Sequence, residues 1–270
     1  MTKEVLVSGT SFWYTESGGG TVKHRAFRRL VPEADTAVLF IHGILGTPDH
    51  FRDLIPLEQQ IPENWTLCNV LLEGHGTNAD AFGAASMEKW RRQVWTAFEE
   101  LADAHEQVVL VAHSMGTLFA LQMAAAYPDK VAFLFLLGVP MRPTLRPCMT
   151  RDSLAMVFGW LPEDHVLWKA GSVKLTKKLW KYIPWIPRFL ELFQEIYRTE
   201  EILPLLNSPC VAYQSRRDEL VSNRSRAVLL RSGGIEVCEL LSSTHYVYSE
   251  EDQDRIIGDF ADRIKKISHD

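Results

Sequence analysis

A short motif near the middle of the chain has the residue types of a serine nucleophile. Residues 112–116 read AHSMG and join the apolar run 108–112 to the helix-favouring sequence 115–126. Small residues around a serine allow a sharp turn from strand to helix, which projects the hydroxyl above a sheet. This position predicts Ser114 as a nucleophile rather than an idle loop serine.

A serine hydroxyl needs a base to take its proton, and the base needs an acid to orient it. Of the nine histidines, only His165, His245 and His269 follow Ser114. His165 falls in an irregular segment and His269 is the penultimate residue, whereas His245 lies between the strand-like segment 235–241 and the last helix. In a strand–turn–helix serine hydrolase the base follows the serine on a late loop, so we expect His245 to be the base.

Two adjacent carboxylates, Asp218 and Glu219, are candidates for the acid. They follow a strand-like segment that ends near Gln214, and Asp218 precedes His245 by 27 positions. Their charges are the same, so the local sequence leaves both open.

A glycine-punctuated loop, HGILG at residues 42–46, follows the apolar run 37–41. Backbone amides in such a loop stabilise the oxyanion of acyl transfer, and we expect the donors to be the N–H groups of Ile44 and Met115. For His42 and for His75, which lies in the turn LEGHGT, we expect structural hydrogen bonds rather than acid–base roles. His113 is expected to point away from the serine.

Composition excludes several classes of protein. Of the 270 residues, 46% are hydrophobic and 23% charged, which is typical of a globular chain with a packed core. The net charge of -5 supplies no overall basic field, so we expect no nucleic-acid partner. A small-molecule substrate is expected instead, and oligomeric state is left open.

Cysteine spacing and hydropathy bear on metal sites and compartment. The four cysteines lie at least 28 positions apart, so no zinc-ligand spacing exists and we expect buried free thiols with no metal. The N-terminal sequence lacks the apolar stretch of a signal peptide, and no run approaches the ~20 apolar residues of a membrane span. These features predict a cytoplasmic protein without integral membrane contact.

Strand-like and helix-like segments alternate along most of the chain, which is typical of a mostly parallel sheet with helices on both faces. An antiparallel start is expected, with a turn at Gly18–Gly20. The apolar runs lack period-two alternation, as strands buried on both faces do. We expect eight strands, at 4–7, 12–15, 37–41, 67–72, 108–112, 131–137, 211–213 and 235–241, and helices at 87–105, 115–126, 223–231 and 250–266.

Strand-like and helix-like segments no longer alternate between residues 141 and 205, a stretch here called the cap segment. It holds six of the 13 prolines and four of the eight tryptophans. We expect an inserted cap, with residues 1–140 and 206–270 forming the core domain, and an apolar substrate pocket beneath it that includes residues such as Trp160 and Trp185. Within the cap segment an apolar stripe is expected to pack onto the main body, with contact to the substrate as the alternative, and three charged residues lie opposite. The stripe consists of Phe189, Leu190, Leu192, Phe193, Ile196 and Tyr197, and the charged residues are Glu191, Glu195 and Arg198.

Together the motifs HGILG, LEGHGT, AHSMG, SRRDELV and STHYV resemble those of the α/β-hydrolase superfamily, and within it the bacterial monoacylglycerol lipases and carboxylesterases. The resemblance runs from about residue 36 to 266. It implies an α/β-hydrolase fold, Ser114 as nucleophile, Asp218 and His245 as its partners, and no cofactor. Two positions depart from the usual pattern, Ala112 and Thr117, where glycines are common.

The activity implied by this resemblance is hydrolysis of carboxylic esters, monoacylglycerols or short- and medium-chain acyl esters, through an acyl-enzyme. Thioester, amide and carbon–carbon hydrolysis use the same three side chains, so the fold does not choose among them. A non-catalytic binding module on this scaffold is the alternative from a different class. Such a module usually lacks part of the triad, whereas this chain has a candidate for every role.

Overall fold

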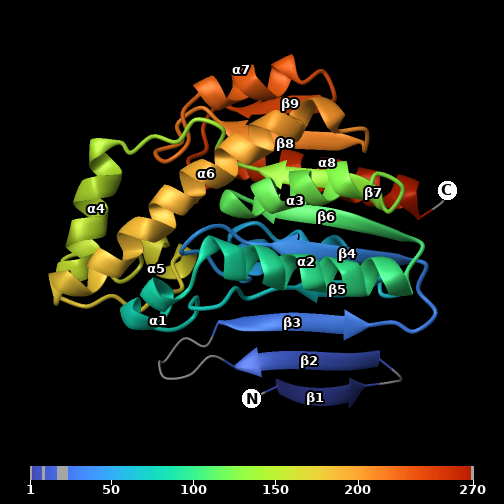
Figure 1. Cartoon of the computed structure of the whole chain (residues 1–270), viewed down its shortest axis with the longest axis horizontal. Coiled ribbons are helices and arrows are strands. Elements are labelled where there is room, and N and C mark those ends of the chain that lie inside the picture. The colour runs from blue at the N-terminus through green and yellow to red at the C-terminus, as the bar shows by residue number, and fades with distance from the viewer. Residues whose placement is uncertain (1, 8–9, 17–23, 269–270) are drawn as a thin grey trace.

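A nine-stranded sheet forms the centre of the computed structural model, which describes residues 2–7, 10–16 and 24–268 (Figure 1). Its strand order is β1-β2-β3-β5-β4-β6-β7-β8-β9. Neighbouring strands from β5 to β9 run parallel, whereas β1, β2, β3 and β5 pair antiparallel in turn. The strands are β1 (Thr2–Val7), β2 (Thr10–Glu16), β3 (Arg25–Leu30), β4 (Thr36–Ile41), β5 (Thr66–Asn69), β6 (Gln107–His113), β7 (Val131–Leu137), β8 (Cys210–Ser215) and β9 (Ile235–Leu240).

The sheet has one strand more than the eight expected. The unexpected strand is β3, whose sequence RAFRRL is rich in arginine and half-buried throughout, so it carries no apolar run. The predicted antiparallel start is confirmed by the pairing of β1 with β2 and of β2 with β3. The predicted turn at Gly18–Gly20 lies outside the described residues.

Helices cover both faces of the sheet, so strands such as β4 are apolar on both sides and lack period-two alternation. Ala37, Leu39 and Ile41 lie in the core beneath α2, α3 and α7, whereas Val38 and Phe40 lie in the opposite core beneath α8. All four predicted helices are present, with ends within two residues of those expected. The helices and short helical turns are α1 (Ala79–Ala84), α2 (Met87–Ala104), α3 (Met115–Ala126), α4 (Pro147–Phe158), α5 (Val166–Ala170), α6 (Ile186–Ile202), α7 (Arg224–Arg231), α8 (Glu250–Ile267), η1 (His50–Leu54), η2 (Glu58–Gln60), η3 (Leu179–Trp185) and η4 (Leu203–Leu205).

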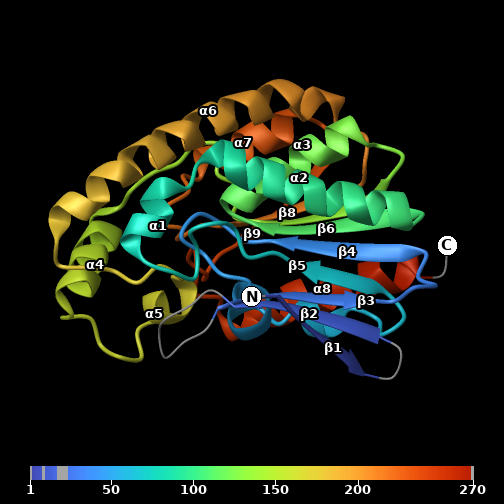
Figure 2. The same cartoon turned by 60° about the horizontal axis from the view of Figure 1, so that its bottom comes forward.

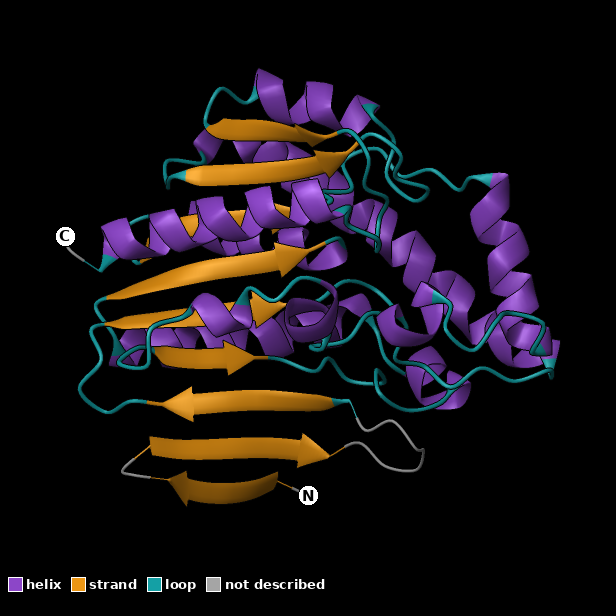
Figure 3. Cartoon of the chain, turned by 180° about the vertical axis from the view of Figure 1, so that it is seen from behind, coloured by secondary structure: helices purple, strands orange, loops and turns teal. Residues whose placement is uncertain are grey.

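Between β7 and β8 the chain leaves the sheet and forms α4, α5, η3, α6 and η4. Seen from behind, α4, α5 and the first part of α6 lie beyond the carboxyl ends of the parallel strands (Figure 3). The remainder of α6 crosses above α2 and α3 (Figure 2). The cap segment therefore stands over the sheet edge where the loops with the candidate residues emerge.

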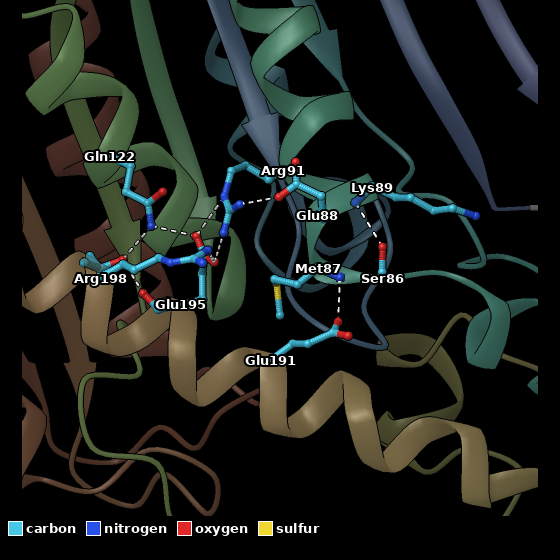
Figure 4. A network of polar contacts seen from close by, with 10 residues as sticks. Ser86, Met87, Glu88, Lys89, Arg91, Gln122, Glu191, Glu195 and Arg198 are labelled. Atoms are coloured by element: carbon cyan, nitrogen blue, oxygen red, sulfur yellow. Dashed lines mark hydrogen bonds and ion pairs between the residues drawn. The ribbon is translucent and has the colours of Figure 1, made fainter.

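The orientation of α6 agrees only in part with the one predicted from its apolar stripe, since Ile196 and Leu192 pack on the core and Arg198 is exposed as expected. Glu195, expected on the outer face, is 1% exposed and accepts hydrogen bonds from Arg91 on α2 and Gln122 on α3 (Figure 4). Of the stripe, Ile196 is buried, whereas Leu190, Phe193 and Tyr197 are more than half exposed, and Phe189, Leu192 and Phe193 line a cavity. The inward side of the helix is therefore mixed: Ile196 and Leu192 pack on the apolar core, while the carboxylates find partners on the body, Glu191 accepting from the N–H of Met87.

The cysteines are free, as expected, but they are not all buried. Cys68 and Cys210 are buried, Cys238 is half-buried and Cys148 is exposed at the start of α4. Within the described ranges, no helix is both long enough and apolar enough to cross a bilayer.

Candidate active site

Ser114 lies on the sharp turn between β6 and α3, where the sequence motif predicts it. Its φ of 52° and ψ of -126° are rarely adopted by a residue with a side chain, so the surrounding structure must hold the turn. The Ser114 N–H donates to the carbonyl of Leu137 at 2.9 Å, which ties the turn to β7. Its carbonyl accepts from both the N–H and the hydroxyl of Thr117, at 3.0 and 2.6 Å. Threonine at this position thus serves the turn directly.

Two glycines allow neighbouring segments of the chain to pack closely around Ser114. A Cβ on Gly116 would lie 2.4 Å from the carbonyl oxygen of Ile41, and a Cβ on Gly43 would lie 2.7 Å from the Cβ of Ser114. Both contacts are shorter than real Cβ atoms make, so these positions require glycine. The loop after β4 is thereby brought against Ser114.

His245 and Asp218 come together from the loops after β9 and β8. The Nδ1 of His245 lies 2.8 Å from the Oδ2 of Asp218, and both side chains are almost fully buried. Asp218 Oδ1 accepts the N–H groups of Leu220 and Val221, at 2.8 and 2.7 Å. An ionised carboxylate only accepts hydrogen bonds, so Nδ1 carries the proton and Nε2 is left with a lone pair.

That Nε2 atom is buried and has no hydrogen-bond partner among the described residues. Orphaned buried polar atoms are rare in folded proteins, and one that carries a lone pair is available to accept a proton. No hydrogen bond joins it to the hydroxyl of Ser114 in this structure. The described residues therefore bring the two candidates His245 and Asp218 into contact and leave the Nε2 of His245 unpaired.

The backbone of His245 is held by two further residues. Its N–H donates to the Oε2 of Glu219 at 3.1 Å, and its carbonyl accepts from the Nε2 of His113 at 3.2 Å. Glu219, the competing candidate for the acid, thus contacts the main chain of His245 rather than its imidazole. His113 lies between His50 and His245, with ring centroids 3.9 and 4.6 Å away. Sequence reasoning missed both contacts, because neither residue type nor spacing indicates a partner on the distant main chain.

The pKa of His245 differs in direction from those of its histidine neighbours. Burial acts to lower the pKa of His245, but the charge and hydrogen bond of Asp218, with the charge of Glu219, raise it above the usual value. Burial dominates elsewhere: it lowers the pKa of His42 to about 4 and of His50 to about 3, and it lowers that of His113. Asp218 therefore makes the imidazole of His245 more basic than those of His42, His50 and His113.

The loop at residues 43–46 is fixed by two histidines, in the structural roles expected for them. The Nδ1 of His42 donates to the carbonyl of Gly43 at 2.8 Å, and its Nε2 accepts from the chain after β5. The N–H of Leu45 donates to the Nε2 of His75 at 3.0 Å. No hydrogen bond of the described residues uses the N–H of Ile44 or of Met115, so the two amides expected to meet an oxyanion remain available.

A cavity of about 800 Å³ reaches Ser114 from beneath the cap segment. Its walls come from the loop at Ile44 and Leu45, from α4 and α5, and from the inner face of α6, and no charged residue lines it. Trp185 is buried and lines the cavity as expected. Trp160 does not line it and is 75% exposed, because it follows the end of α4 and stacks on Phe158. The expectation for Trp160 was therefore wrong.

Among the described residues, no group of three or more histidine, cysteine, aspartate or glutamate side chains is placed to hold a metal ion. The buried thiols of Cys68 and Cys210 lie in the core rather than in the cavity. Burial raises the pKa of Cys68 to about 11, so this thiol stays protonated at neutral pH. Besides Ser114, the residues that line the cavity include several with hydroxyl groups, among them Tyr182 and Tyr246.

Comparison with known proteins places this geometry in context. The solved structure of the metagenome-derived lipolytic enzymes LipS and LipT has a TM-score of 0.66 and 20% identity, over 86% of this chain and 94% of that one. A monoacylglycerol lipase from Paleococcus ferrophilus has a TM-score of 0.58 and 16% identity, over 88% and 98%. A thioesterase domain from the curacin biosynthetic pathway has a TM-score of 0.54 and 15% identity, over 98% and 99%. At these identities the likeness shows the fold.

A comparison with curated proteins found no match. The sequence model of the alpha/beta hydrolase family matches residues 38–266, which is most of the chain and includes every candidate site residue. The mostly parallel sheet, covered by helices on both faces, agrees with this match and confirms the predicted fold class. The chain belongs to the alpha/beta hydrolase family.

Proposed function

We propose that the protein is a serine hydrolase of carboxylic esters, with Ser114 as nucleophile, His245 as base and Asp218 as the acid that orients it. The observation that carries this proposal is the buried His245–Asp218 pair, in which Nε2 of His245 has no partner. Ser114, whose backbone is strained, lines the cavity. Asp218 is preferred over Glu219 because it is the carboxylate that contacts the imidazole.

In the proposed reaction, His245 Nε2 takes the proton of Ser114 while the serine oxygen attacks the ester carbonyl carbon. The N–H groups of Ile44 and Met115 stabilise the resulting oxyanion, a role in which one donor is worth about 3 to 4 kcal/mol in other serine hydrolases. His245 then gives the proton to the leaving alcohol. Water repeats the cycle on the acyl-enzyme, releasing the acid and restoring Ser114. The missing bond between Ser114 and His245 forms in the substrate complex, since such contacts often tighten only when substrate binds.

The cavity supports an apolar acyl group as the substrate portion beside Ser114. Its volume of about 800 Å³ is ample for a small-molecule ligand, and its uncharged walls disfavour a charged one. We therefore propose esters of medium-length or longer fatty acids, monoacylglycerols included, with residues 141–205 acting as the cap over them and the remainder as the core domain.

The test is labelling and turnover. A fluorophosphonate probe is expected to label the protein and to fail on Ser114→Ala, with nitrophenyl ester turnover falling by about 10⁴ or more. Turnover is expected to rise with acyl length, and a parallel set of thioesters and anilides measures the competing bond types. Unchanged turnover in Ser114→Ala contradicts the proposal. Faster cleavage of thioesters or amides than of matched esters would make thioesters or amides, and not esters, the substrate class.

A further inference from the structure

Exposed apolar side chains concentrate on the cap segment. Of sixteen large hydrophobic residues exposed in the described chain, thirteen lie between residues 141 and 205, which form about a quarter of the sequence. The densest group covers η3 and the start of α6, where Leu179, Trp180, Ile183, Ile186 and Leu190 are each 54–64% exposed. Scattered exposed hydrophobics are normal, but a contiguous group marks an interaction surface.

The same stretch is basic. Residues 174–190 contain five lysines or arginines and no aspartate or glutamate, although the whole chain carries a net charge of -5. Lys181 pairs with Asp80, and Arg188 pairs with Glu191 at 2.5 Å, so these two charges are compensated by neighbouring elements. The exposed Lys174, Lys177 and Lys178 have no acidic partner within the described residues. The amine of Lys178 lies 6.0 Å from the ring of Trp180, so charge and apolar surface are interleaved.

We propose that residues 174–190, here called the docking face, bind the surface of an anionic lipid bilayer or aggregate. Exposed tryptophan, isoleucine and leucine side chains flanked by lysines suit the boundary between headgroups and acyl chains, where apolar tips enter and ammonium groups meet anionic headgroups. A second copy of the chain fits less well. A two-fold dimer through this face would bring two uncompensated lysine clusters against each other.

The docking face continues into the cavity. Leu179 and Phe189 are exposed at the surface, at 54% and 37%, and both also line the cavity that reaches Ser114. An apolar molecule in a docked lipid surface therefore has a continuous apolar route to the serine. This route rests on the proposed function, whereas the docking itself depends only on the face.

Vesicle flotation tests the docking. The whole protein is expected to float with vesicles of equal phosphatidylcholine and phosphatidylglycerol and to bind pure phosphatidylcholine much more weakly. The double variant Lys177→Glu, Lys178→Glu is expected to bind the anionic vesicles at least about tenfold more weakly, since each lysine near such a surface is worth about fivefold. The variant Trp180→Ser, Ile183→Ser is expected to lose binding as well. None of these four residues lines the cavity.

Matched controls lie on the body of the protein. The variant Lys265→Glu, Lys266→Glu makes the same charge change on the exposed end of α8, and Leu230→Ser removes an apolar residue that is 49% exposed on α7. Both are expected to float like the unaltered protein. If the controls lose as much binding as the docking-face variants, net charge or general hydrophobicity explains flotation and the proposal is wrong.

Two measurements on the same samples separate the possible failures. Turnover of a short water-soluble nitrophenyl ester is expected to be the same in the docking-face variants and the unaltered protein, which also shows that the variants are folded. Flotation without turnover refutes the proposed function and leaves the docking intact, whereas turnover without flotation refutes the docking. Sedimentation equilibrium adds one outcome against it: a dimer that Trp180→Ser, Ile183→Ser dissociates would make a second copy the occupant.

Discussion

At the scale of single residues, His245 is fixed at three points, each by a different kind of contact. Asp218 holds its imidazole, Glu219 holds its N–H and His113 holds its carbonyl. Only the first contact acts on the ring that would move a proton. The two adjacent carboxylates, equivalent in the sequence, therefore have separable consequences for the reaction.

Substituting each carboxylate by its amide tests this separation. Asp218→Asn is expected to lower kcat by about 10⁴, because an amide in that position favours the wrong imidazole tautomer. Glu219→Gln keeps an oxygen that can accept the N–H of His245, so kcat is expected to fall by no more than about tenfold, the size of one hydrogen bond weakened by the loss of charge. Steady-state kinetics on a nitrophenyl ester measures both. The reverse ranking would exchange the roles of the two carboxylates.

The pH dependence of turnover follows from the raised pKa of His245. As the proposed base, His245 must be neutral to take a proton, so kcat/KM is expected to rise with pH and to reach half its maximum above pH 6.5, the ordinary histidine pKa. Glu219→Gln removes one of the negative charges that raise this pKa and is expected to move the midpoint to lower pH. A midpoint below 6.5 in the unaltered protein, or one that moves up in Glu219→Gln, would show that another group controls the acid limb.

At the scale of elements, α6 shows how a buried ion network decides which face of a helix turns inward. Glu195 is almost fully buried and contacts Arg91 and Gln122, while the apolar side chains of α6 divide among the core, the cavity and the surface. The wall of the cavity is thus held in place by contacts on the far side of the same helix. This arrangement links the stability of the cap segment to α2, and to α3, the helix that begins after Ser114.

Arg91→Ala tests that anchor. It leaves the buried carboxylate of Glu195 without its main partner, so the free energy of unfolding is expected to fall by about 3 kcal/mol. Lys265→Ala, which breaks an exposed pair with Asp262 at 3.9 Å, is the matched control and is expected to change stability by less than about 1 kcal/mol. Urea unfolding measures both. Equal effects would mean that Glu195 is hydrated in solution and anchors nothing.

The elements also show how far the sequence alone predicts this structure. Apolar runs and helical periodicity predicted the buried strands and four helices, because burial on both faces of a sheet leaves a direct compositional signal. β3 was not predicted because arginines occupy half its length. The burial of Glu195 on α6 was not predicted because periodicity defines two faces without showing which charged residue has a buried partner. Asp218 and Glu219 were indistinguishable because their difference lies in tertiary contacts with His245.

At the scale of the whole molecule, buried neutral histidines couple folding to pH. Burial lowers the pKa values of His42, His50, His75 and His113 in the folded protein, to about 4 for His42 and about 3 for His50. In the unfolded chain the same groups titrate near 6.5. Below pH 6.5 the unfolded state therefore binds protons that the folded state refuses, and the free energy of unfolding falls as the pH drops toward 4.

His245 acts in the opposite sense, because its folded pKa is raised. Its stabilising contribution is fully present below pH 6.5 and is lost as the pH rises through the folded pKa, but one group of this sign does not offset four of the other.

Urea unfolding is therefore expected to show a marked loss of stability between pH 6.5 and 5, a window above the range in which most carboxylates titrate. His50→Phe keeps a ring against His113 and removes one titrating group, so it is expected to make this dependence shallower whatever its effect on stability at pH 8. A stability that stays level from pH 7 to 5, or an unchanged slope in His50→Phe, would show that these imidazoles accept protons in the folded state.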